Sequence, residues 1–291
     1  MRTYIKRAAG LCLSAAVLLS LWACEAAASE PTPTIDPHEG QVQVSDGAGG
    51  TMWVELYEGV SKSAYEPGDF YGEEGYICFS GEGYTALRGI DVSFYQGKID
   101  WDAVAADGVE FAIIRAGYRG YSQGGVFEDE MFRENVSGAL EAGLRVGVYF
   151  FSQAVNTAEA EEEARFVLEL IEGYDVTMPV IFDWENIGNG ETARTDNVSG
   201  RMLTDCALAF CGAVEAAGYE PGVYFYRRLG YYQYELDRLS GLTLWVSAPG
   251  QTPDFYYEHE MWQYSFTGQV EGIEGDTDLN LYFEKHEPEV R

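Results

Sequence analysis

Beyond residue 88, short apolar runs alternate with segments whose apolar residues have helical spacing. One pattern occurs three times, as ADGVEFAIIR (106–115), EAGLRVGVYF (141–150) and AAGYEPGVYF (216–225). In each copy small residues end a helix, a glycine follows, and a short link leads into an apolar strand. The pattern predicts the helix-to-strand joint of a repeating β/α unit. The helix-ending glycines are Gly108, Gly143 and Gly218.

The same alternation continues to the end of the chain. Apolar spacing predicts three longer helices, at residues 129–142, 157–172 and 196–217. Counted from Arg88, we expect eight strands and about five helices, with shorter links between the last three strands. This α/β order predicts a mainly parallel sheet, closed as an irregular TIM-like β/α barrel over residues 88–285. Functional residues would then lie at the C-terminal ends of the strands.

The sequence before the barrel has a different composition. Residues 24–50 are rich in Ala, Ser, Pro, Thr, Gly and acids, which predicts a flexible tether. Residues 51–87 contain two strand-like segments, 52–57 and 76–80, separated by turn residues. We therefore expect a small β-rich extension between the tether and the barrel.

The N-terminus has the pattern of an export signal. Three basic residues precede an apolar stretch, so residues 1–23 are predicted to be a signal peptide. The segment LWAC resembles a bacterial lipoprotein cleavage box, with Cys24 as the lipidated residue and Trp22 as a departure from it. Plain secretion and an uncleaved anchor are the alternatives. We expect an exported protein at the bacterial cell surface.

Composition excludes some functions. The net charge is −30, a surface that repels nucleic acid phosphates and anionic membranes. No cysteine or histidine pair has zinc-ligand spacing, so we expect no metal and no cofactor. The acids that follow the predicted N-cap Asn156, including Glu159 and Glu163, are interpreted as a solvated helix face, and His259 as a surface residue.

One stretch, MPVIFDWE (178–185), has the pattern of a buried strand that ends in two carboxylates. Side chains alternate along a strand, so Asp183 and Glu185 are expected on one side and Trp184 on the other. Their Cα atoms would lie about 6.6 Å apart. Two carboxyls at that separation can flank one glycosidic bond and hold different protonation states. Two solvated acids at a strand end are the alternative interpretation.

The other predicted strand ends add acids and aromatic residues. Asp91 ends the first barrel strand, and Asp278 opens the last one. Aromatic rings stack on sugar faces, and their convergence at one mouth suggests a carbohydrate groove. The candidate substrate-binding residues at these ends are Tyr118, Tyr149, Tyr224, Trp245, Trp262, Gln263 and Tyr264.

These motifs, taken together and in order, resemble the family 25 glycoside hydrolases, the lysozymes that cleave bacterial peptidoglycan. The resemblance covers residues 88–283, about two thirds of the chain. The motifs that carry it are GIDVS (89–93) with QG (96–97) and IDW (99–101), FAIIRAGY (111–118), AGLRVGVYFFS (142–152), PVIFDWE (179–185), PGVYFY (221–226), and WQY (262–264) with GDTDLN (275–280). The pair Phe94-Tyr95 departs from the family, which often has a polar or histidine-containing pair there.

The resemblance implies hydrolysis of the β-1,4 bond between N-acetylmuramic acid and N-acetylglucosamine. By matching position, Glu185 is the proton donor, and Asp183 stabilises the transition state or orients the substrate's acetamido group. Asp91 and Asp278 match the family's other acidic positions. We expect like-charge repulsion from Asp183 to raise the pKa of Glu185. The expected partner is the peptidoglycan glycan strand, and the expected state is a monomer.

Two alternatives belong to other classes. A wall-binding lipoprotein that kept the barrel and lost catalysis would show the same fold, although the four intact acids argue against it. A metal-dependent polysaccharide deacetylase would need histidine ligands, and the three histidines of the chain have no useful spacing.

Overall fold

The computed structural model describes residues 36–187 and 192–286. The chain divides into two compact units, Met1–Glu39 and Gly40–Arg291. The predicted signal peptide and Cys24 lie outside the described residues, as does most of the first unit. Within the described ranges, no helix has the length and apolar character that a membrane span requires.

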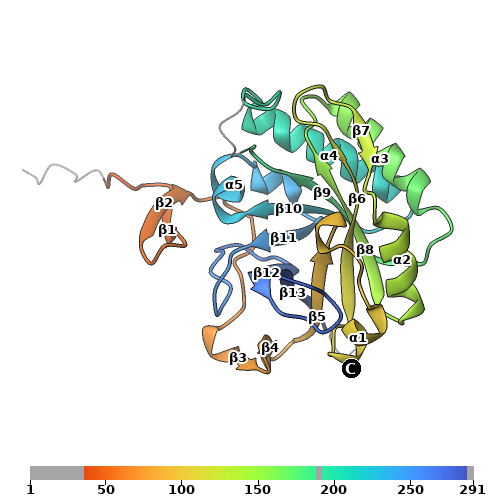
Figure 1. Ribbon diagram of the computed structural model, residues 1–291. Helices are drawn as coiled ribbons and strands as arrows, with labels where there is room; N and C mark the ends of the chain where they lie inside the picture. Colours follow the sequence, from red (N-terminus) through yellow and green to blue (C-terminus); the bar gives the residue numbers. More distant parts are fainter. Residues whose placement is uncertain (1–35, 188–191, 287–291) are drawn as a thin grey trace, which may run out of the picture. The chain divides into compact units, whose positions relative to one another are not determined.

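Eight strands close into a barrel, as the sequence predicted (Figure 1). Seven run parallel to their neighbours, and the last strand is antiparallel to both of the strands that flank it, which closes the sheet. A short strand, β7 (Val126–Glu128), pairs with the outer edge of β6. The barrel strands are β5 (Tyr84–Val92), β6 (Phe111–Arg119), β8 (Arg145–Ser152), β9 (Val176–Trp184), β10 (Pro221–Tyr226), β11 (Thr243–Ser247), β12 (Met261–Gly268) and β13 (Thr277–Lys285).

The helices cover the outer side of the strands that they connect (Figure 1). The predicted cap of the third helix is confirmed, because the side chain of Asn156 accepts a hydrogen bond from the backbone N–H of Glu159. The fourth helix begins at Gly200 with Ser199 as its cap, later than predicted. The α-helices are α1 (Trp101–Ala106), α2 (Phe132–Glu141), α3 (Thr157–Ile171), α4 (Gly200–Ala216) and α5 (Arg227–Tyr232), and the 3-10 helices are η1 (Pro67–Asp69), η2 (Phe94–Gln96) and η3 (Leu236–Leu239).

The barrel interior is filled by side chains up to the level of the site. Its apolar cluster is formed by Phe111, Ile113, Met178, Ile181, Tyr224, Trp245, Met261 and Tyr282. Glycines face the largest of these groups. A Cβ atom at Gly89 would lie 2.2 Å from the Phe111 ring, and one at Gly222 would lie 2.5 Å from Ile181 Cδ1. Small residues opposite large ones therefore let side chains fill the barrel interior below the site.

Ordered structure begins earlier than the sequence indicated. The predicted tether, residues 24–50, includes β1 (Gln41–Ser45), which forms an antiparallel hairpin with β2 (Thr51–Glu55). The tether prediction is therefore wrong for residues 41–50. The signal was the alternation in QVQVS, which points Val44 to the buried side while the glutamines stay outside. The barrel likewise starts at Tyr84, before the predicted boundary at residue 88.

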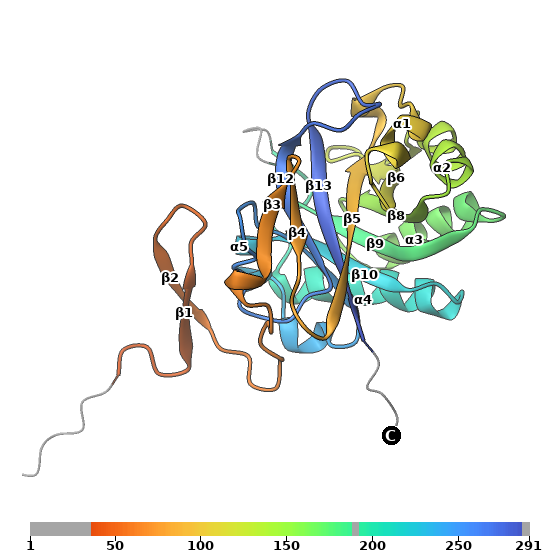
Figure 2. The same ribbon diagram turned by 90° about the horizontal axis from the view of Figure 1, so that it is seen from below.

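A second hairpin covers strands that no helix covers (Figure 2). It consists of β3 (Phe70–Glu73) and β4 (Tyr76–Phe79). The ring of Phe70 packs edge-on against Trp262 of β12, and the ring of Phe79 packs against Phe283 of β13. The extension therefore takes the place of a helix on the outer wall of the barrel.

His259 lies in the wall between this extension and the barrel, so its prediction as a surface residue is wrong. The side chain is fully buried, and the Tyr65 ring packs edge-on against it at 5.2 Å. Its Nδ1 lies 2.9 Å from the carbonyl oxygen of Tyr257. Burial lowers the pKa of His259 to about 4, so the imidazole is neutral at physiological pH. Only the tertiary packing of Tyr65 against Tyr84 of β5 and Phe283 of β13 reveals this burial.

Candidate active site

A cavity of about 500 Å³ opens at the C-terminal ends of the barrel strands. Four carboxyl groups line it, and they come from three different strands. Asp91 lies near the end of β5, Asp183 and Glu185 at the end of β9, and Asp278 at the start of β13. Because β13 runs against the other strands, its first residues reach the same mouth as their last residues.

The end of β9 has the alternation that the sequence predicted. Asp183 and Glu185 both line the cavity, whereas Trp184 is buried on the opposite side. There its indole N–H donates a hydrogen bond to the carbonyl oxygen of Ala154 at 3.3 Å. Asp183 is almost wholly buried and Glu185 half-buried, so the two carboxyls occupy different depths of one site.

Asp91 is held by a chain of amides and aromatic donors. Its Oδ2 accepts hydrogen bonds from Gln263 Nε2 at 2.9 Å and from Asn280 Nδ2 at 2.8 Å. The Oδ1 of Asn280 accepts from the indole N–H of Trp245 at 2.8 Å, and the Oε1 of Gln263 accepts from the Tyr224 hydroxyl at 2.9 Å. These buried bonds fix both amides so that their N–H groups point at the carboxylate.

Burial raises the pKa of all four carboxyls. The pKa of Glu185 rises to about 7, first because the group is desolvated and then because Asp91 repels its charge. The pKa of Asp91 rises to about 6 despite three hydrogen bonds that favour its ionised form. Burial and the charge of Asp91 raise the pKa of Asp278 to about 8. The expectation that Asp183 would be the main cause for Glu185 is therefore corrected: burial dominates.

Neighbouring charges of both signs act on the pKa of Asp183. Burial raises its pKa well above the ordinary value, and Glu185 and Asp91 add to the rise. Arg115 acts in the opposite direction and favours the ionised form. The guanidinium lines the cavity and is held by Asp129, with Nε 2.7 Å from Oδ2. A buried cation thus lies beside a cluster of acids.

The predicted substrate-binding residues divide into two groups. Tyr149, Tyr224, Trp245 and Gln263 line the cavity. The prediction is wrong for Trp262 and Tyr264, which flank Gln263 and therefore point out of the barrel. The indole N–H of Trp262 donates to the carbonyl oxygen of Ala248, and the Tyr264 hydroxyl accepts from the backbone N–H of Ile77.

Tyr118 also lies away from the cavity lining. Its ring stacks on Phe127 of β7, with centroids 5.4 Å apart. The register of β6 against β8 shifts between Arg115 and Gly117, which puts Tyr118 opposite Phe151. The Arg115 guanidinium lies 5.6 Å from the centroid of the Tyr118 ring. A bulge of this kind has no reliable signal in the sequence.

The cavity lining extends beyond the candidate site residues. Tyr95 is 76% exposed and lies at the cavity mouth, with its ring 4.1 Å from that of Phe94. Several of the others stand two residues from a candidate site residue along the same strand end, where alternation places them on the same side. The additional lining residues are Val92, Ser93, Tyr95, Gln96, Arg115, Phe151, Tyr226, Ser247 and Phe266.

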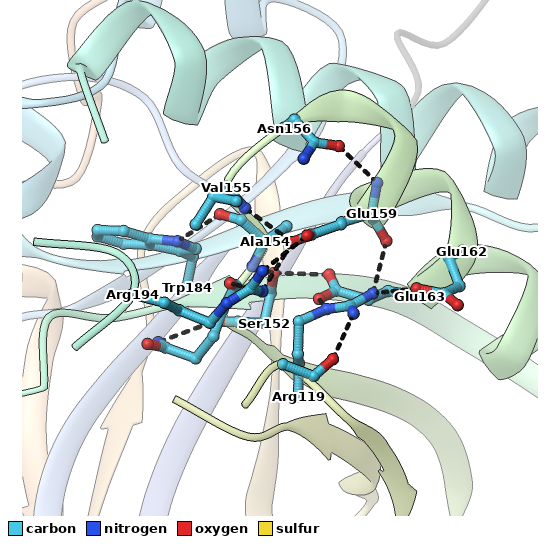
Figure 3. A network of polar contacts seen from close by, with 12 residues as sticks. Arg119, Ser152, Ala154, Val155, Asn156, Glu159, Glu162, Glu163, Trp184 and Arg194 are labelled. Carbon is cyan, nitrogen blue, oxygen red and sulfur yellow. Dashed lines mark hydrogen bonds and ion pairs between the residues drawn. The ribbon is translucent and has the colours of Figure 1, made fainter. Parts of the chain in front are cut away.

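Two glutamates of α3, Glu159 and Glu163, do not belong to a solvated face, so that interpretation is wrong for them (Figure 3). Glu163 is fully buried and pairs with Arg119, whose Nε lies 2.6 Å from Oε1. Glu159 forms a two-pronged pair with Arg194, both distances being 2.7 Å. The first two turns of α3 therefore lie against the ends of β6 and β8. Spacing alone cannot distinguish these acids from the exposed Glu161 and Glu162.

No group of three or more histidine, cysteine, aspartate or glutamate side chains is arranged to hold a metal ion in residues 36–187 and 192–286. The chemistry that the site offers is that of buried carboxyls which exchange protons near neutral pH. Such a site can donate a proton and stabilise a developing positive charge.

The chain was compared with known proteins. Residues 90–273 match a family described as Glycosyl hydrolases family 25. Lysozyme M1 of Streptomyces globisporus is 28% identical over 210 residues, which is 68% of each chain. The autolytic lysozyme of Clostridium acetobutylicum is 28% identical over 201 residues, and the match covers 68% of this chain but only 56% of that enzyme.

Solved structures share the fold. A family 25 glycosyl hydrolase from Bacillus anthracis superimposes with a TM-score of 0.59 at 22% identity, over 74% of this chain and 96% of that one. The modular autolysin LytC of Streptococcus pneumoniae, solved with a synthetic peptidoglycan ligand, gives a TM-score of 0.60 at 24% identity. That match covers 84% of this chain and 57% of the autolysin.

Proposed function

The chain belongs to glycosyl hydrolases family 25, and on this basis we propose that it is a peptidoglycan hydrolase that cleaves the β-1,4 bond between N-acetylmuramic acid and N-acetylglucosamine. The observation that carries the proposal is the gathering of four carboxyls in one cavity, with the pKa of Glu185 raised to about 7. A carboxyl that keeps its proton near neutral pH can protonate a leaving oxygen.

Glu185 is the proton donor in this proposal, and Asp183 carries the negative charge. Two carboxyls that repel each other in a buried site do not both ionise readily. Arg115 favours the ionised form of Asp183, while burial and Asp91 favour the protonated form of Glu185. Burial raises the pKa of both carboxyls, and at Asp183 only Arg115 opposes that rise. The assignment of the proton to Glu185, at the mouth, and of the charge to the deeper Asp183 therefore follows the matching positions of the family motif. Ionised Asp183 then stabilises positive charge at the sugar ring or orients the acetamido group.

The glycan strand binds above this pair. Tyr149, Tyr224 and Trp245 offer aromatic surface at the cavity, and Gln263 offers an amide. Asp91 and Asp278 do not need to touch the scissile bond in this proposal. They act on Glu185, because Asp91 raises its pKa and because Asp278 shares a hydrogen bond with Asp91.

The test is digestion of purified peptidoglycan by the full-length chain, with mass spectrometry of the soluble products. The wild type is expected to release fragments with muramic acid at the reducing end. Glu185→Gln keeps the shape of the side chain and removes the acid, so it is expected to lose at least about 100-fold in rate. Glu130→Gln, which changes an exposed glutamate, is the matched control. Absence of reducing-end muramic acid from the wild type on walls of several chemistries would overturn the proposal.

We also propose that the protein is exported and held at the cell surface by a lipid on Cys24. The basic start, the apolar stretch to residue 23 and the LWAC segment support this proposal. Residues 1–23 would be removed, and the segment before Gly40 would act as a tether for a monomeric enzyme. Labelling of growing cells with an alkyne fatty acid, followed by membrane fractionation, tests it. Cys24→Ala is expected to lose both the label and the membrane association, and label retained by Cys24→Ala would exclude Cys24 as the site.

A further inference from the structure

The residue after β8, Gln153, is tied to the backbone of the proposed proton donor. Its Nε2 donates a hydrogen bond to the carbonyl oxygen of Glu185 at 2.9 Å, and another to the carbonyl oxygen of Ser152 at 2.9 Å. Its Oε1 accepts from the hydroxyl of Thr195 at 3.0 Å. The side chain is fully buried, so these bonds form away from water.

From these contacts we propose that Gln153 is a positioning residue, whose side-chain amide holds the Glu185 backbone at the height and direction that catalysis requires. The inference rests on the proposed function of Glu185 as acid. Glu185 is the first residue after β9, so the ladder of the barrel no longer fixes it. Gln153, at the end of the neighbouring strand β8, provides a hydrogen bond to the Glu185 backbone where the hydrogen bonds of the sheet have ended.

The same amide joins both ends of the segment that follows β9. Its donor side meets Glu185, where the segment begins, and its acceptor side meets Thr195, where the segment ends. The backbone carbonyl of Gln153 also accepts from Arg194 Nη1 at 2.9 Å. Displacement of Glu185 from the cavity would therefore break the hydrogen bond between its carbonyl oxygen and Gln153.

One ion pair and one buried hydrogen bond hold the residues around Gln153, and both are drawn in Figure 3. Arg194 pairs with Glu159, which also accepts from the backbone N–H of Val155 at 3.1 Å. The Ser152 hydroxyl donates to Glu163 Oε2 at 2.6 Å. These contacts connect the first turns of α3 to the residues on both sides of Gln153.

The position needs the chemistry of an amide. It requires two N–H donors for two carbonyl oxygens and one acceptor for a hydroxyl, on a side chain of this length. Glutamate lacks the donors when ionised, and methionine has the length without either function. With the donors removed, the Glu185 backbone can move toward solvent. Its carboxyl would then be better hydrated and further from Asp91, which faces it from β5.

The experiment is Gln153→Met, assayed on soluble glycan oligomers from peptidoglycan over a range of pH. We expect kcat to fall about 10–100-fold, the loss expected for a misplacement of about 1 Å, with KM within about twofold. We also expect the alkaline limb of the kcat profile to move to lower pH, because a hydrated Glu185 loses its proton more easily. Thr195→Val, which removes only the hydroxyl on the acceptor side, is expected to give a smaller change in the same direction.

Thr204→Val is the matched control, because Thr204 is also fully buried and its hydroxyl also makes two hydrogen bonds, to Gly200 and Glu235 in another region. It is expected to lower thermal stability and leave kcat and the pH profile unchanged. A Gln153→Met enzyme that resembles Thr204→Val, with lower stability and an unchanged profile, would overturn the positioning role.

A titration without substrate separates this inference from the proposed function. Carboxyl carbon NMR follows the ionisation of Glu185 directly in wild type and in Gln153→Met. We expect the pKa of Glu185 to be lower in the variant. An unchanged pKa would overturn the inference even if the wild type is an active hydrolase. An inactive wild type would overturn the proposed function and leave this measurement valid.

Discussion

Asp91 and Asp278 lie directly opposite each other on antiparallel neighbours, β5 and β13. The two carboxyls share a hydrogen bond, which favours the ionised form of Asp91 and the protonated form of Asp278. Their pKa values separate accordingly, to about 6 for Asp91 and about 8 for Asp278. Near neutral pH the pair therefore carries one negative charge. That charge faces Glu185 and helps it to keep its proton.

Asp91→Asn is expected to lower the pH above which the enzyme loses activity. Activity requires protonated Glu185, so it is lost as pH rises through the pKa of Glu185, about 7. Removing the charge of Asp91 lowers that pKa, and the alkaline limb of kcat/KM moves to lower pH. Asp175→Asn changes an exposed acid below the barrel mouth and should leave the limb in place. A limb that stays fixed in Asp91→Asn would contradict the charge coupling.

Asp278→Asn is expected to stabilise the protein at pH 8 and not at pH 4. The folded pKa of Asp278 is raised from 3.8 to about 8, so the folded state binds more protons than the unfolded state between these values. The free energy of unfolding therefore falls as pH rises through this window, and asparagine removes that loss. Each kcal/mol gained should raise Tm by about 2–4 °C. Scanning calorimetry at pH 4 and at pH 8 measures the change in Tm, with the exposed Asp175→Asn as control. Equal shifts at both pH values would disagree with the burial of Asp278.

Substitution of Trp245 and of Trp262 should distinguish a residue that contacts the substrate from one that only packs. Each indole N–H makes one buried hydrogen bond, at 2.8 Å and 2.9 Å respectively. Substitution by phenylalanine should therefore cost about 1 kcal/mol of stability in either case. Only Trp245 lines the cavity and holds Asn280 against Asp91. Trp245→Phe is expected to lower kcat/KM about tenfold. Trp262→Phe should leave kcat and KM unchanged. A loss of kcat/KM in Trp262→Phe would argue against the outward position of Trp262.

A chain that begins at Arg88 is expected to fold poorly. It lacks the first half of β5, in which Tyr84 to Leu87 pair with Lys285 to Tyr282 of β13. It also lacks the hairpin and the Tyr65 ring that cover the outer wall. Circular dichroism and thermal unfolding should show a lower Tm or aggregation for residues 88–291 than for residues 40–291.

A point substitution tests the packing of the extension on the barrel without truncation of the chain. Tyr65 contacts Phe283 at a ring distance of 4.2 Å and donates a hydrogen bond to the carbonyl oxygen of His259. Tyr65→Ala is expected to cost about 2 kcal/mol or more in unfolding free energy. Tyr71→Ala removes a tyrosine of the same extension that is 49% exposed, and it should cost little. Equal losses in the two variants would mean that the extension adds no specific packing.

Local rules in the sequence determined the elements and their order. Gly108, Gly143 and Gly218 all adopt positive φ at the predicted helix ends, because glycine has no Cβ to oppose that conformation. Alternation along β9 determined that Asp183 and Glu185 share a side and that Trp184 does not. These features depend only on neighbours in the chain, so the sequence contains the information directly.

The tertiary structure decided which face of each element is buried and which groups meet. Alternation showed that Trp262 and Tyr264 share a face, and only the register of β12 placed that face outside the barrel. Glu163 and His259 look like ordinary polar residues, and distant segments bury them. The meeting of Asp91 with Asp278 and of Gln153 with Glu185 likewise depends on strand direction and neighbour order. Such contacts join residues far apart in the chain, and the free energy that selects them comes from the packing of the whole barrel.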